Sequence, residues 1–243
     1  MSLQRISKRS LLCGLAALTA AGSARADDCT LDVEIVPGAW SQLQGWAQAL
    51  TPRLGSWWTT INHGLGVTAC ERRGIKLVLA VVKPDSVAAA ARGDRIIVNA
   101  PYVLANLGNA DMDRMIAHEL VHVAQAYPEG TPPIWLVEGI ADYLRYYVLF
   151  PTDPGRFFDP DKESWHEGYS PSAGLIDWAE TRRPGTLAAI NTAMHAGDDG
   201  GAAFALAAGL TPAAAWRAYL KTRPAAASAD RRQAYWASLK HAG

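Results

Sequence analysis

The sequence predicts one α+β domain, in which a small mixed sheet and the helix that carries the candidate site are followed by a mainly helical C-terminal part. Thr30–Val36 alternates polar and apolar residues, and Ile75–Val82 is almost continuously apolar. These patterns are typical of a half-buried strand and of a buried central strand. From residue 168 onward the apolar residues recur at helical spacing. No repeat of fixed period divides the chain, so we expect one domain.

The first 26 residues have the composition of a secretory signal peptide. Basic residues precede a short apolar run, Leu11–Gly22, and Ala24-Arg25-Ala26 matches an A-x-A cleavage site. The run is too short to span a bilayer as a permanent helix. We therefore expect export to the periplasm or to the outside of the cell, with residues 1–26 removed and residues 27–243 forming the mature domain.

The charge balance and the hydropathy pattern argue against two classes of partner. The chain has 23 Lys and Arg and 23 Asp and Glu, and loss of the four basic residues in residues 1–26 would leave 19 against 23. No basic stripe indicates a nucleic-acid interface, and no second hydrophobic span indicates a membrane anchor. The mature chain is long enough to bury one sizeable core.

Cysteine usage agrees with export. Cys13 lies in the predicted signal peptide, which leaves Cys29 and Cys70 as an even pair. In an oxidising compartment we expect these two to form a disulfide. Its loop of about 40 residues would stabilise the fold by roughly 3–4 kcal/mol on the chain-entropy model. The alternative, two metal-ligating thiols, lacks a CxxC spacing.

Further elements are expected between these regions. Residues 40–61 carry an apolar stripe at helical spacing that includes four tryptophans, and we expect a break near Pro52. The tryptophans could line a ligand groove, but such a stripe is more often part of a core. Val87–Gly93 is expected to form a loop or a short helical turn, and Arg95–Asn99 a strand.

The next helix carries the candidate site. Asn109 or Asp111 can cap its start, and it contains the motif HELVH. His118 and His122 are four residues apart, so both imidazoles lie on one face, one turn apart. A tetrahedral zinc ion takes such a pair of ligands, and Glu119 can act as general base on a zinc-activated water. Ordinary helices also contain HExxH by chance, but this helix is apolar, where such side chains are unusual.

A catalytic zinc ion normally has three protein ligands, so a third is expected nearby. Glu138, on a helix predicted at about residues 134–149, is the candidate. Asp142 lies one turn further along and can accept a hydrogen bond from a ligand histidine, which holds that histidine in the right tautomer. The structural alternative is a simple pair between Asp142 and Arg145 at i+3.

Residues 151–167 are acidic and rich in proline and are expected to form a solvated loop. Their aspartates could bind calcium, but the order of an EF-hand loop is missing. His166, close to Tyr169, is a candidate for a cleft wall. Breaks between the later helices are expected at Pro184-Gly185, Gly197–Gly201 and Gly209–Pro212.

Three blocks of sequence resemble the basic secretory protein family, found in plants and bacteria and regarded as zinc peptidases of the gluzincin type. The blocks are HELVHVAQ (118–125), LVEGIADYLR (136–145) and GYSPSAGLIDW (168–178). Together they are more specific than HExxH alone. The resemblance implies a zincin-like metallopeptidase domain that binds one Zn²⁺ per chain and acts on a peptide or protein.

Matched position by position, the resemblance implies that His118, His122 and Glu138 are the metal ligands and that Glu119 is the base. Asp142 matches the second carboxylate of the gluzincin ExxxD pattern. The family name refers to basic proteins, whereas this mature chain is mildly acidic, so a preference for acidic partners does not transfer.

Two further expectations come with the resemblance. Tyr169 falls on the Gly-Tyr of the third block, where its phenol could donate a hydrogen bond to an oxyanion; the alternative is a packed aromatic at a helix start. In zinc peptidases of this general fold, a strand at the edge of the sheet often lies over the cleft, where an extended substrate can pair with it. Arg95–Asn99 is the candidate for this strand; the alternative is an ordinary strand.

The function predicted from the sequence is therefore a secreted zinc metallopeptidase with Glu119 as general base. One alternative is a secreted zinc-binding or defence-type protein without peptidase activity, which would need a fourth protein ligand to close the coordination sphere. Another keeps the zinc but hydrolyses a non-peptide amide or ester.

Overall fold

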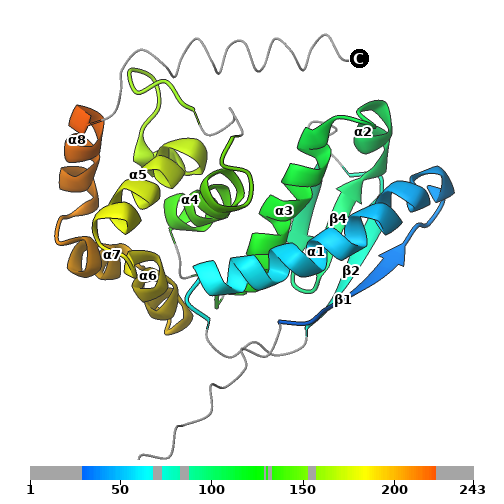
Figure 1. Cartoon of the computed structure of the whole chain (residues 1–243), viewed down its shortest axis with the longest axis horizontal. Coiled ribbons are helices and arrows are strands. Elements are labelled where there is room, and N and C mark those ends of the chain that lie inside the picture. Colours follow the sequence, from blue (N-terminus) through cyan, green and yellow to red (C-terminus); the bar gives the residue numbers. More distant parts are fainter. Residues whose placement is uncertain are drawn as a thin grey trace, which may run out of the picture.

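The computed structural model describes residues 29–67, 73–82, 88–128, 130, 133–152 and 157–222. The predicted signal peptide and Cys70 lie outside these residues, so export and the Cys29–Cys70 disulfide stay predictions. A sheet covered by two long helices forms one part of the molecule, and a group of helices forms the other (Figure 1). In the part of the chain that the structure describes, no helix is long and apolar enough to cross a membrane.

Among the described residues, the sheet has four strands in the order β1-β2-β4-β3. β1 (Leu31–Val36) and β4 (Arg95–Asn99) both pair in parallel with β2 (Arg73–Ala80), while β3 (Ala89–Arg92) pairs antiparallel with β4. The predicted small mixed sheet is confirmed, and its apolar strand β2 is central. Because side chains of a strand alternate between faces, one face of β2 and β4 enters the core. Its buried residues are Ile75, Leu77, Leu79, Ile96 and Val98.

The strand β3 replaces the loop or helical turn that was expected within Val87–Gly93. Alanine is depleted from strands, so this segment has no strand signal of its own, and pairing with β4 decides its conformation. Gly93, at φ 59°, and Asp94 form the two-residue turn between the strands. The hairpin makes β3 the edge of the sheet. The prediction that Arg95–Asn99 forms that edge was therefore wrong.

The first long helix, α1 (Gln44–Gly64), follows a 3-10 turn, η1 (Ser41–Leu43), and runs through Pro52, so the expected break was wrong. A proline inside a helix costs about 3 kcal/mol, whereas each large apolar side chain that is buried contributes about 1.5–3 kcal/mol. The helix buries several on both sides of the proline, against β1 and α3. They are Leu50, Leu54, Trp57, Trp58 and Ile61, so Trp57 and Trp58 belong to the core.

The helix that carries the HELVH motif, α3 (Ala110–Gln125), follows the short helix α2 (Ala100–Ala105). Its predicted cap is confirmed, because the side chain of Asn109 accepts a hydrogen bond from the backbone N–H of Asp111 at 2.9 Å. Ala126, at φ 36°, ends the helix in the left-handed conformation. The apolar face of α3 is buried, which fixes the direction of its polar face. This buried face includes Ile116, Ala117, Leu120 and Val121.

The next helix, α4 (Ile134–Tyr143), continues into a π-helical segment, η2 (Leu144–Leu149), so the helix predicted at residues 134–149 is present. It packs along α5 (Tyr169–Arg182). Gly139 permits this close approach, because a Cβ atom there would lie 2.4 Å from the Cβ of Ser172.

The remaining helices, α6 (Thr186–His195), α7 (Gly201–Ala208) and α8 (Pro212–Thr222), are separated at the three predicted breaks (Figure 1). The loop ahead of the 3-10 turn η4 (Trp165–Glu167) is less solvated than expected. Phe158 is fully buried and stacks on Trp216 at 5.4 Å between ring centroids, which anchors this loop to α8.

Candidate metal centre

Two neighbouring helices supply the candidate ligands. His118, Glu119 and His122 lie on α3, and Glu138 and Asp142 lie on α4. All five line a cavity of about 520 Å³, whose wall is completed by the edge strand β3 and by the start of α5. The predicted residues are thus brought together at one place.

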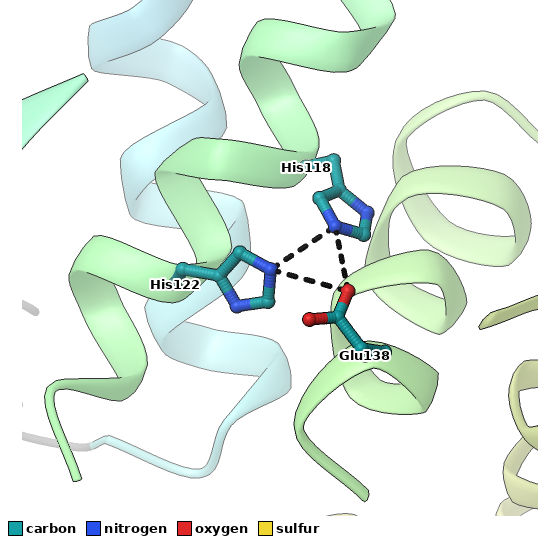
Figure 2. Close-up of side chains that lie close together, drawn as sticks. All are labelled: His118, His122 and Glu138. Carbon is teal, nitrogen blue, oxygen red and sulfur yellow. Dashed lines mark hydrogen bonds and ion pairs between the residues drawn. The ribbon is translucent and has the colours of Figure 1, made fainter. Parts of the chain in front are cut away.

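Three of these side chains point at one another (Figure 2). The Nε2 atoms of His118 and His122 are 3.0 Å apart, and Glu138 Oε2 lies 3.2 Å from the first and 3.5 Å from the second. Two atoms that each lie about 2.0–2.1 Å from a tetrahedral zinc ion are about 3.3 Å apart. The spacing of the three atoms therefore fits a single small cation.

The second carboxylate of α4 holds one ligand in place. Asp142 is buried, and its Oδ1 lies 2.8 Å from Nδ1 of His118. With a proton on Nδ1, the lone pair of Nε2 is directed at the cluster. Arg145, the alternative partner considered for Asp142, donates from Nη2 to Asp111 Oδ1 at 2.6 Å. The Asp142–His118 contact makes Asp142 part of the site.

Electrostatics favour a positive charge at the point where the three atoms meet. Burial disfavours a charged His118, but its hydrogen bonds to Asp142 and Glu138 outweigh burial and raise the pKa of His118 to about 10. Burial likewise disfavours a charged Glu138, yet hydrogen bonds with His118 and His122 lower the pKa of Glu138 to about 2. The same arrangement stabilises a proton or a metal cation.

Glu119 is not a member of the ligand cluster but lines the same cavity. The backbone N–H of Ala91, on β3, donates to Glu119 Oε2 at 2.7 Å. Burial raises the pKa of Glu119, an effect that the nearby His118 and His122 oppose. A carboxyl group that takes up a proton more readily than usual is suited to general-base chemistry.

Tyr169 lies over the site in an unusual backbone conformation. Its ring is stacked over that of His118 at 6.3 Å between centroids, and the residue is 52% exposed. Its φ of 52° is rare for a residue other than glycine. Tyr169 is also the first residue of α5, as the alternative of an aromatic at a helix start expected, and half of the residue is exposed. His166, by contrast, is exposed, stacks on Trp165 and stays outside the cavity wall.

One contact of the site was missed by the predictions from sequence. Gln125, one turn after His122, is buried, and its Oε1 lies 2.7 Å from Nδ1 of His122. The only signal of this contact in the local sequence is that Gln125 lies three residues after His122, a spacing that brings two side chains of a helix together. Arg145 and Tyr146, on η2, also line the cavity and were not expected there.

Comparison with known proteins identifies a family that matches the chain. The model of a family described as a peptidase of plants and bacteria matches residues 47–219, which include every candidate ligand. No curated protein and no solved structure matches the chain.

Proposed function

The chain belongs to this family of plant and bacterial peptidases, because the match covers well over half of it, and we propose that it is a zinc-dependent metallopeptidase. The observation that carries the proposal is the convergence of His118 Nε2, His122 Nε2 and Glu138 Oε2 at 3.0–3.5 Å. Two imidazoles and one carboxylate are a common ligand set of catalytic zinc.

The number of ligands favours catalysis over a purely structural zinc site. Structural zinc sites are closed by four protein ligands, whereas catalytic sites keep one position open. Within the described ranges, the group of side chains spaced to hold a metal has three members. Zinc held there would supply a Lewis acid that polarises the scissile carbonyl and lowers the pKa of the attacking water.

Glu119 is the proposed proton carrier. The N–H of Ala91 engages Oε2, and Oε1 is the oxygen that we assign to accept the proton of the attacking water. The raised pKa of Glu119 lets its carboxyl group keep that proton until the amine leaves. Tyr169, whose pKa is raised mainly by burial, stays protonated at neutral pH and could donate a hydrogen bond to the developing oxyanion.

The edge strand supports a peptide as the substrate. Ala89, Ala90 and Ala91 of β3 line the cavity, and within the part of the chain that the structure describes β3 pairs with β4 alone. An extended peptide can add to such an edge through main-chain hydrogen bonds. A small non-peptide amide or ester would not use this edge. The proposal includes export to the periplasm or the exterior, which is supported by the signal-like residues 1–26.

The test is cleavage of a mixed peptide library by the zinc-loaded protein, read by mass spectrometry, with Glu119→Gln alongside. We expect cleavage by the wild type and a loss of about 10²–10⁴-fold in Glu119→Gln, which removes the proton carrier and keeps the ligands. Zinc content is measured on both proteins. Cleavage at equal rates would contradict the role of Glu119. An intact library with zinc bound to both would contradict the peptidase assignment.

A further inference from the structure

The two ligand histidines are held through their Nδ1 atoms by side chains of different chemistry. His118 faces the carboxylate of Asp142, whereas His122 faces the neutral amide of Gln125. An amide can donate from its nitrogen or accept through its oxygen. The orientation of the Gln125 amide therefore decides which of the two ring nitrogens of His122 carries the proton. The surroundings of Gln125 fix that orientation.

The amide nitrogen of Gln125 has a partner that can only accept. Its Nε2 donates to the backbone carbonyl of Val137 at 2.9 Å. Oε1 therefore faces His122, and because an amide oxygen can only accept, Nδ1 of His122 carries the proton. The lone pair of Nε2 is then directed at His118 and Glu138, where the cation would lie.

We propose that Gln125 is the positioning residue of the second histidine ligand, which it holds in the tautomer that binds metal. The inference rests on the zinc site proposed above. Gln125 also ties His122 on α3 to Val137 on α4, the residue that precedes the ligand Glu138. The Gln125 side chain thus fixes the orientation of the His122 ring. It also fixes the distance between His122 and α4, the helix that carries Glu138.

Burial and charge explain why a neutral amide suits this position. Gln125 is 2% exposed, so loss of either hydrogen bond would leave a polar group without water. The site already contains the carboxylates of Glu119, Glu138 and Asp142. A neutral acceptor orients the imidazole without adding a fourth negative charge at close range.

The first measurement needs no variant. In the folded protein, nitrogen-15 NMR distinguishes the two neutral tautomers of histidine and also detects the Nδ1–H of a zinc-bound ring. We expect the His122 proton on Nδ1, both with zinc and after treatment with a chelator at high pH. A proton on Nε2 in the zinc-free protein would overturn the proposal.

The second measurement is the dissociation constant for zinc, obtained by competition with a chelator. Gln125→Met keeps the volume and removes both hydrogen bonds, and we expect it to weaken zinc binding by about 10- to 100-fold. Gln125→Glu retains an oxygen acceptor for Nδ1 but loses the hydrogen bond to Val137, and we expect it to restore part of the affinity. Binding by Gln125→Met within twofold of the wild type would overturn the proposal.

Asn62 on α1 provides a control, because it is a buried amide that is not among the residues lining the cavity. Its Nδ2 donates to the backbone carbonyl of Trp58 at 2.8 Å. Asn62→Leu should lower thermal stability and leave zinc affinity unchanged. An equal loss of affinity in this control would assign the effect of Gln125→Met to general destabilisation and overturn the proposal. A wild type that binds no zinc would instead overturn the proposed function.

Discussion

A proton and a metal cation compete for Nε2 of His118. Asp142 and Glu138 stabilise positive charge on this ring, and the pKa of His118 is raised to about 10 although burial opposes the charge. Zinc bound as proposed would have to displace this proton at neutral pH, which would make its binding dependent on pH. The metal-free protein retains the proton at neutral pH. The stability of the metal-free protein should therefore change over the pH range in which His118 loses this proton.

For the metal-free protein we expect the free energy of unfolding to decrease as the pH rises from 6.5 toward 10. The pKa of His118 is higher in the folded than in the unfolded chain. The stabilisation that protonated His118 provides is therefore complete at a pH below its pKa in the unfolded chain. It is lost as the pH rises through its pKa in the folded chain. Urea denaturation of chelator-treated protein across this range measures the effect. Asp142→Asn, which removes one charge partner, should flatten the curve. An unchanged curve would contradict the assigned role of Asp142.

At the scale of single elements, local signals predicted α3 and α4 well and failed elsewhere. The cap at Asn109 and the 3.6-residue period are properties of the local sequence, and so is the spacing of the histidine ligands. β3 and the passage of α1 through Pro52 depend on partners distant in the sequence, which local propensity does not contain. Gln125 is a similar case, because the carbonyl that orients its amide belongs to another helix.

The contact between α4 and α5 leads to a prediction on Gly139. Gly139→Ala would place a methyl group 2.4 Å from Ser172 Cβ, so the two helices must move apart. We expect a loss of about 1–3 kcal/mol in the free energy of unfolding. The control is Gly55→Ala in α1, where nothing lies within 4 Å of the new Cβ; there we expect a gain of about 0.5–1 kcal/mol. Equal effects in chemical denaturation would contradict the close packing.

At the scale of the whole molecule, the site lies where the sheet part meets the helical part. α3 packs on the sheet and on α1, whereas α4 packs on α5, so a metal bound by both helices links the two parts. A buried ion pair, Arg145 with Asp111, makes the same connection beside the cavity. Zinc bound at the proposed site should therefore stabilise the fold as a whole.

We expect zinc to raise the melting temperature of the metal-free protein. A ligand that binds only the folded state stabilises it by about 4 kcal/mol when its free concentration is about 1,000 times its dissociation constant. For a chain of this length, that stabilisation corresponds to a rise in melting temperature of about 8–16 °C. Differential scanning calorimetry with and without zinc measures the shift. His122→Ala should abolish it because two ligands remain. Calcium and magnesium, which prefer oxygen ligands, should have little effect on the wild type. The same zinc shift in His122→Ala would place the stabilising ion elsewhere in the molecule.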